Sequence, residues 1–268
     1  MSTRASLPCC HGAGEDISVH PIRSTSLSIT PKRPFMRRET TNFIRGILED
    51  WLPANVWDSP LFHVLMRLKM GRHIDYMADF KRRAVFLTPR EYRDMYAAHP
   101  RQHENTDLSV ACIERIKPRV LGPLVCDVGC GTGYLVRTLA AHPPLKECHF
   151  TGVDFVVEQG MKSDERIKFL QLNVERMPFA DKEFDTVICT HVIEHILDIR
   201  GVVAELRRIT RRRLILVVPR EREFAYSFNP HFHFFPYQHS FLRVMIPVPA
   251  KHQIEAVGRD IFYIEDYD

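Results

Sequence analysis

The chain has 268 residues with a hydrophobic fraction of 45%, which suits one α/β domain with an appended segment and is small for two independent domains. Its 37 basic and 33 acidic residues give a net charge of +4, whereas electrostatic nucleic-acid binders usually carry a larger basic excess. The sequence has no apolar run of membrane-spanning length and no secretory signal, and its seven cysteines lack disulfide-framework spacing, so we expect a soluble, cytoplasmic protein with reduced thiols.

The first part of the chain divides into two segments. Residues 1–34 are rich in Ser, Pro, Thr and Gly, and we expect them to be disordered; a start at Met36 is the alternative interpretation. Residues 35–118 form a predicted helical cap, with helices expected at Thr41–Trp51, Leu61–Met70, Thr88–Tyr96 and Asp107–Lys117. This cap either roofs an active site or only covers one edge of a sheet.

Residues 119–268 form the predicted α/β domain. Strands are expected at Leu124–Val128, His149–Val153, Ile167–Leu170, Phe184–Cys189 and Leu214–Val218, with helices at Tyr134–Ala141 and Val202–Ile209. This alternation predicts a doubly wound, mostly parallel sheet. Two further strands, Gln253–Val257 and Ile261–Ile264, are separated by Gly258 and two more residues, a spacing that predicts an antiparallel hairpin.

A glycine loop follows the first predicted strand. Gly129, Gly131 and Gly133 stand between that strand and a helix, where glycine lets a ligand approach the backbone closely and the helix N-terminus favours negative charge. Asp154 lies 21 residues after Gly133, at the end of the next strand, where a carboxylate accepts hydrogen bonds from ribose hydroxyls. These features fit an adenosine-containing ligand and do not separate NAD from S-adenosylmethionine.

Longer segments carry a more specific resemblance. The segments are VCDVGCGTG (Val125–Gly133), GVD (Gly152–Asp154), LNVERMPFADKEFDTVICTHVIEHI (Leu172–Ile196) and the strand that ends at Val217–Pro219. With them, residues 105–245 resemble class I S-adenosylmethionine-dependent methyltransferases, especially the broad type 11 group that methylates small molecules, lipids and glycans. The resemblance implies a Rossmann-like, seven-stranded sheet and S-adenosyl-L-methionine as the cofactor.

The resemblance also implies the cofactor contacts. Asp127 would hold the methionine amino group, Asp154 the ribose hydroxyls, and the backbone of Val174 the adenine edge. Asn173 stands where the group usually has Asp, but its amide keeps a carbonyl acceptor. The full expected set is Asp127, Gly129, Cys130, Gly131, Gly133, Asp154, Phe155, Asn173, Val174, Thr190 and His191.

Catalytic candidates follow the fourth strand. His191, Glu194 and His195 share one face if a helix begins there, and methyl transfer to a hydroxyl or amine benefits from a base. We expect His195 to be that base and Glu194 to orient it; alternatively, His195 packs the turn and caps neighbouring backbone. The same residues match the HxxEH pattern of metalloproteases, which we disfavour because they directly follow a buried strand.

Residues 226–239 are rich in aromatic residues and histidine. They follow the fifth strand, where α/β sheets bind ligands, so His231, His233 and Tyr237 are candidate acceptor-binding residues; alternatively, this segment packs hydrophobically on the next short helix. The segment and Glu194–His195 also resemble, more faintly, metal-dependent methyltransferases acting on the terminal ribose of small RNAs. Because His191 replaces a glutamate of that pattern, which weakens binding to a hard cation, the sequence favours no metal.

The basic run Arg207–Arg213 ends a predicted helix, where cations complement the helix dipole. We interpret it as a solvated face rather than a contact with RNA or anionic lipid. The sequence thus predicts methyl transfer from S-adenosylmethionine to a hydroxyl or amine of a small-molecule, glycan or lipid-like acceptor. The alternatives are a metal-assisted RNA ribose 2'-O-methyltransferase and a non-catalytic cofactor-binding module whose cap or Phe-rich loop binds a partner.

Overall fold

The structure is a computed structural model that describes residues 53–70, 82–88, 90–92, 105–157, 161–224 and 230–268. These residues belong to one compact unit, Phe35–Asp268. The expected disorder of residues 1–34 and the helix expected at Thr41–Trp51 lie outside the described residues. Within the described ranges, no helix has the length and apolar character needed to cross a bilayer.

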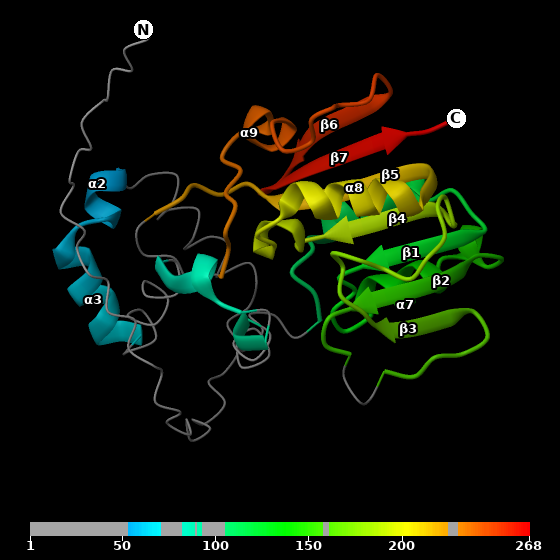
Figure 1. Ribbon diagram of the computed structural model, residues 1–268, viewed down its shortest axis with the longest axis horizontal. Helices are drawn as coiled ribbons and strands as arrows, with labels where there is room; N and C mark the ends of the chain where they lie inside the picture. The colour runs from blue at the N-terminus through cyan, green and yellow to red at the C-terminus, as the bar shows by residue number, and fades with distance from the viewer. Residues whose placement is uncertain (1–52, 71–81, 89, 93–104, 158–160, 225–229) are drawn as a thin grey trace, which may run out of the picture. The chain divides into compact units, whose positions relative to one another are not determined.

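Seven strands form one sheet in the order β3-β2-β1-β4-β5-β7-β6 (Figure 1). Strands β1 to β5 pair in parallel, while β7 is antiparallel to both β5 and β6. The strands are β1 (Leu124–Val128), β2 (His149–Asp154), β3 (Ile167–Gln171), β4 (Phe184–Thr190), β5 (Thr210–Pro219), β6 (His252–Val257) and β7 (Asp260–Asp266). The predicted Rossmann-like sheet with its C-terminal antiparallel hairpin is confirmed.

Both faces of the sheet are covered by helices. Along β5, Leu214, Leu216 and Val218 belong to one buried cluster with α8 (Ile199–Ile209) and α9 (Gln238–Leu242). The alternate residues Ile215 and Val217 belong to a second cluster with α6 (Val110–Ile116) and α7 (Tyr134–Ala140). Figure 1 shows α8 lying along β4 and β5. Because successive side chains point to opposite faces, a strand covered on both faces reads as a continuous apolar run.

Before the sheet, the helices expected at Leu61–Met70 and Asp107–Lys117 are present with shifted ends, and two short helical segments were not expected. Helix α2 (Ala54–Trp57) precedes α3 (Pro60–Met70), and a short 3-10 helix covers Ala84–Phe86. Helix α6 begins at Val110 rather than at Asp107, because the Ser109 side chain accepts the Cys112 N–H as an N-cap. The ring of Trp57 packs 4.7 Å from that of Phe224, so α2 contacts the segment after β5.

The predicted helix start at Thr88 has the geometry of a capping box. The Glu91 carboxylate accepts the Thr88 N–H at 2.8 Å, and the Thr88 hydroxyl accepts the Glu91 N–H at 3.3 Å. This reciprocal pair satisfies backbone donors at a helix start. Residues 93–104, which would contain the rest of this predicted helix, lie outside the described part of the chain.

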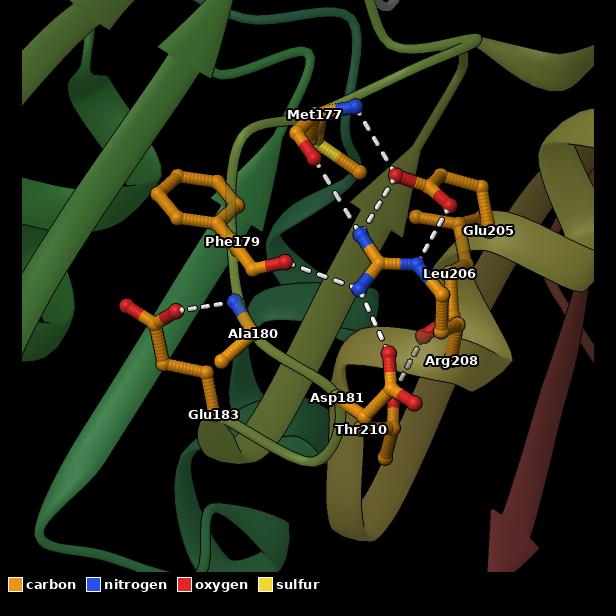
Figure 2. Close-up of polar contacts among 9 residues, drawn as sticks. All are labelled: Met177, Phe179, Ala180, Asp181, Glu183, Glu205, Leu206, Arg208 and Thr210. Carbon is orange, nitrogen blue, oxygen red and sulfur yellow. Dashed lines mark hydrogen bonds and ion pairs between the residues drawn. The ribbon is translucent and has the colours of Figure 1, made fainter.

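Most arginines of the basic run at the end of α8 form ion pairs with carboxylates. The sequence predicted a solvated face and no such pairs. Arg208 donates to both carboxylate oxygens of Glu205 and to the backbone carbonyls of Met177 and Phe179 (Figure 2). It thereby ties the loop after β3 to α8. The further pairs are Arg207–Glu265, Arg211–Asp185 and Arg213–Asp266.

Candidate functional site

The glycine loop lies between β1 and α7 in a backbone conformation that requires glycine. Gly129, Gly131 and Gly133 have φ angles of 80°, 55° and 74°, a region that residues with a Cβ rarely adopt. A Cβ on Gly129 would lie 2.0 Å from Cγ2 of Val192. The N–H groups of Gly129 and Cys130 both donate to the Val153 carbonyl, so the loop is fixed against β2 and against the turn after β4.

Asp154 fixes the other side of this loop. It ends β2, and its Oδ2 accepts the Gly131 N–H at 2.7 Å while its Oδ1 accepts the Val156 N–H at 3.0 Å. A carboxylate oxygen can accept two hydrogen bonds, so each oxygen keeps the capacity for one more donor. The carboxylate is therefore held rigidly at the loop with room for two hydroxyl donors.

Asp127 lies beneath the loop near the end of β1. Its side chain is buried, and its Oδ1 has no hydrogen-bond partner among the described residues. Burial, reinforced by the negative charge of Asp154, raises the pKa of Asp127 to about 7. A buried carboxylate without a full set of donors is costly, and a cationic amino group placed above it would relieve that cost.

The residues expected to surround adenine lie after β2 and β3. Phe155 is partly buried, Val174 is buried, and Asn173 is exposed. The amide of Asn173 is turned onto its own loop, because Oδ1 accepts the Glu175 N–H and Nδ2 donates to the Glu175 carboxylate. An adenine amino group would therefore share the Asn173 oxygen with this turn.

The turn after β4 differs from the helix expected there. His191 has a φ of 55°, and only a single 3-10 turn, Ile193–His195, follows. Helix α8 starts later, at Ile199, because the Asp198 side chain caps it by accepting the Gly201 N–H. The prediction that His191, Glu194 and His195 share one helical face is therefore wrong.

His191 lies between two carboxylates. Its Nδ1 is 3.6 Å from Oε1 of Glu194, and its Nε2 is 3.4 Å from Oδ1 of Asp260. Burial lowers the pKa of His191, but Glu194 and Asp260 outweigh that effect and raise it above the ordinary value. The His191 N–H donates to the Val217 carbonyl, so Thr190 and His191 stay at the edge of the sheet, next to the glycine loop.

Glu194 and His195 meet a third residue from a distant loop. The ligand-type atoms of Glu194, His195 and His231 lie within 4.8 Å of one another, and the two imidazole rings have centroids 4.5 Å apart. Glu194 is fully buried, and neither of its carboxylate oxygens has a hydrogen-bond partner in the described ranges. The structure thus assembles a carboxylate and two imidazoles that are 37 residues apart at most in the sequence.

Electrostatics in this cluster follow from burial and from the charges of its members. Burial alone would raise the pKa of Glu194, but the adjacent His191, His195 and His231 lower it to about 2. Burial and the neighbouring His231 lower the pKa of His195 to about 4. At neutral pH the cluster therefore contains an ionised carboxylate and a neutral His195 imidazole.

The loop after β5 is attached to the same turn. The Glu194 carbonyl accepts the N–H groups of both Phe232 and His233, and the His233 ring contacts the Ile196 carbonyl at 2.9 Å. Tyr237 is 51% exposed and stacks on His239. Of the three candidate acceptor residues, the structure brings only His231 into the cluster.

Three residues of this site were not among the candidates taken from the sequence. Oε2 of Glu221 lies at hydrogen-bonding distance, 2.8 Å, from Nδ1 of His231, and Asp260 faces His191 from the start of β7. Tyr92 donates its hydroxyl to the His195 carbonyl at 2.6 Å. Only Tyr92 had any local clue, because the helix expected at Thr88–Tyr96 places it in the segment expected to form the cap.

Part of the chain is similar to known methyltransferases. Residues 126–218 match the sequence profile of a methyltransferase domain. The chain is 33% identical over 106 residues to the methyltransferase YcgJ of Bacillus subtilis, covering 35% of this chain and 39% of YcgJ. It is 30% identical over 107 residues to a sterol 24-C-methyltransferase of Gibberella zeae, covering 36% of this chain and 26% of that protein.

A third relative is named for a modification of tRNA. The tRNA U34 carboxymethyltransferase of Campylobacter curvus is 32% identical over 93 residues, covering 32% of this chain and 30% of that protein. The chain thus spans less than half the length of each of these three relatives. The matched residues, 126–218, contain the glycine loop, Asp154 and the turn after β4, and they therefore form a methyltransferase domain.

Proposed function

We propose that this protein transfers a methyl group from S-adenosylmethionine to a hydroxyl or amine of a small-molecule, glycan or lipid-like acceptor. The observation that carries the proposal is the buried Asp127 carboxylate beneath the glycine loop, with an oxygen that has no partner among the described residues. S-adenosylmethionine carries both a cationic amino group and a ribose, and NAD has no such amino group. The site therefore fits the methyl donor better than it fits a dinucleotide.

The residues around the loop suit the rest of the cofactor. Asp154 would accept hydrogen bonds from the ribose hydroxyls, and the left-handed glycines would let the methionine and ribose lie close to the backbone. Phe155, Asn173 and the backbone of Val174 would surround adenine, while Thr190 and His191 would lie beside the sulfonium. When bound, the cofactor supplies an activated methyl group, so this chain has to orient an acceptor and exclude water.

His195 is the proposed base for the acceptor proton. Its pKa, lowered to about 4, keeps the imidazole in the unprotonated form that a base requires at pH 7, and it also makes that base a weak one. Tyr92, from the segment before the sheet, donates to the His195 carbonyl, which supports the hypothesis that this segment roofs the site. The pairing of the basic run with carboxylates favours a small acceptor over RNA, because paired cations attract phosphate less.

Calorimetric titration tests the cofactor assignment. The full chain is titrated with S-adenosylhomocysteine, with and without a divalent cation, and with NAD as the control. We expect binding of S-adenosylhomocysteine at one site per chain in the absence of any metal, and little or no binding of NAD. A preference for NAD would contradict the proposal. Methyl transfer to any member of an acceptor panel would exclude the alternative of a binding module without catalysis.

A further inference from the structure

We propose that Glu194, His195 and His231 bind one divalent transition-metal ion, with Zn²⁺ preferred over Mg²⁺. The three side chains come from the turn after β4 and from the loop after β5, and their ligand-type atoms lie within 4.8 Å of one another. Atoms that share one cation at bond lengths of about 2.0–2.2 Å lie at most about 4.4 Å apart, so small side-chain shifts would bring the three onto one ion. A site of this kind departs from the sequence-based expectation of no metal.

The buried carboxylate gives a second, independent reason. Glu194 is fully buried, and both of its carboxylate oxygens lack a hydrogen-bond partner among the residues that the structure describes. The His191 ring stays 3.6 Å from this carboxylate through Nδ1, beyond hydrogen-bonding distance, and faces Asp260 through Nε2. Burying an ionised carboxylate without hydrogen bonds is strongly unfavourable, and a bound cation would supply the missing partner for its oxygens.

Both histidines are oriented as metal ligands usually are. His231 Nδ1 is 2.8 Å from Oε2 of Glu221, and His195 Nδ1 is 3.1 Å from the Pro230 carbonyl. Metal-bound histidines commonly donate one ring N–H to a carboxylate or a backbone carbonyl and bind the ion through the other nitrogen. The same arrangement here assigns Nε2 of each ring to the ion and makes Glu221 a positioning residue.

The composition of the cluster selects the metal. Imidazole nitrogen suits Zn²⁺ and Fe²⁺, whereas Mg²⁺ prefers an octahedral set of oxygens. The sequence predicted no metal because His191 stands where a glutamate ligand was expected. In the structure His191 faces Asp260 instead, and the second imidazole of the cluster comes from His231. Three protein ligands leave at least one position open, which is typical of catalytic rather than structural zinc sites.

The open coordination position could hold the methyl acceptor, an inference that rests on the proposed function. Val192, two residues before Glu194, is the side chain that a Cβ on Gly129 would strike, so the cluster adjoins the proposed cofactor loop. With its Nε2 bound to the cation, His195 would act as a metal ligand in place of the base, and an acceptor hydroxyl bound to the cation would lose its proton more easily. The acceptor O–C bond forms as the S–C bond of the cofactor breaks, S-adenosylhomocysteine leaves as a neutral thioether, and the hydroxyl proton passes to water. This selects hydroxyl over amine acceptors.

Metal binding is measured on the full chain after treatment with a chelator and desalting. Zn²⁺, Mn²⁺ and Mg²⁺ are titrated separately by calorimetry, and bound zinc is counted by mass spectrometry. We expect one Zn²⁺ per chain and an affinity for Zn²⁺ at least a hundredfold above that for Mg²⁺. Less than one equivalent of bound Zn²⁺ at saturation, or equal affinities for Zn²⁺ and Mg²⁺, would overturn the proposal.

Two variants and a matched control locate the site. His231→Gln should lower the Zn²⁺ affinity at least a hundredfold, and Glu221→Gln should lower it roughly tenfold to a hundredfold, as for other orienting residues. His239→Gln, an exposed histidine eight residues further along the chain, should leave it unchanged. Wild-type affinity in Glu221→Gln and His231→Gln would place the zinc elsewhere. If His231→Gln fails to fold, judged by circular dichroism, Glu221→Gln decides.

The open position has its own readout. Co²⁺ replaces Zn²⁺ in the wild-type protein, and acetohydroxamate, a small ligand with a metal-binding oxygen pair, is added. A shift of the visible Co²⁺ absorption is expected, and an unchanged spectrum would contradict an open position. S-adenosylhomocysteine binding without metal and Zn²⁺ binding without cofactor are measured separately, so failure of the metal site is distinguishable from failure of the proposed function.

Discussion

The glycine loop and the Glu194–His195–His231 cluster adjoin one another, but they are built in different ways. The loop consists of five consecutive residues, 129–133, held mainly by backbone contacts to β2. The cluster consists of side chains from two loops, oriented by Glu221 and by the Pro230 carbonyl. A site formed by backbone is encoded by local residue types, whereas a site formed by side chains depends on which loops the sheet brings together.

Cofactor binding at the loop should be weakened most by removing the Asp154 carboxylate. Asp154→Ala removes the acceptor for both ribose hydroxyls, and hydrogen bonds to charged groups contribute about 1.5–3 kcal/mol each. We expect the affinity for S-adenosylhomocysteine, measured by calorimetry, to fall by about two to four powers of ten. Glu165→Ala, an exposed carboxylate between β2 and β3, is the control. Unchanged affinity in a folded Asp154→Ala protein would place the ribose elsewhere.

A substitution in the cluster should lower the rate of methyl transfer and leave the affinity for the cofactor unchanged. His195→Ala removes the proposed base or, where the cation is bound, one of its ligands, so we expect methyl transfer to fall by about a hundredfold or more. The affinity for S-adenosylhomocysteine should stay at the wild-type value, because His195 is not one of the proposed cofactor contacts. His149→Ala, an exposed histidine on β2, serves as control. Full activity of His195→Ala would return this residue to a packing and capping role.

Protonation of Asp127 should make the loop sensitive to pH. The ionised carboxylate attracts the cofactor amino group, and the pKa of Asp127 is raised to about 7 by burial and by Asp154. Affinity for S-adenosylhomocysteine should therefore be constant above pH 7 and fall by about tenfold per pH unit below it. Asp127→Asn should bind more weakly at pH 8 and lose this dependence. A wild-type profile that is flat between pH 5 and 8 would contradict the assignment.

A pair of glycine variants measures the smallest effect. Gly129→Ala and Gly258→Ala both place a Cβ on a residue with positive φ, which costs about 1–2 kcal/mol. At Gly129 the Cβ would also lie 2.0 Å from Val192, while nothing lies within 4 Å at Gly258. Gly129→Ala should thus lower the free energy of unfolding in urea by a further 1–3 kcal/mol or so. Equal losses would show that the loop and the turn after β4 pack less tightly than the structure describes.

The sheet was predictable because its strands are covered on both faces. Each of the five apolar runs became a parallel strand with nearly the expected bounds, and the two expected helices follow β1 and β4. The ends moved where specific side chains intervene. Strand β5 begins at Thr210 rather than Leu214, since Arg211 and Arg213 pair with Asp185 and Asp266.

The turn after β4 was not predictable from periodicity. A spacing of three and four residues fits one helical face, yet His191 adopts a left-handed conformation and Asp198 starts α8 later. Hydrogen bonds from Phe232 and His233 to the Glu194 carbonyl then hold this turn. These contacts join residues nearly forty positions apart, so no local pattern could reveal them.

By itself, the sequence determined the order of strands and helices, the glycine loop and the acidic residue at the end of β2, because each depends on neighbouring residues and on backbone conformation. Only the tertiary structure decided which of the histidines meet. The parallel order of β4 and β5 brings the two loops at their carboxyl ends together, and burial then leaves Glu194 facing His195 and His231. Side-chain neighbours of that kind depend on chain packing over long separations, which spacing in a sequence does not specify.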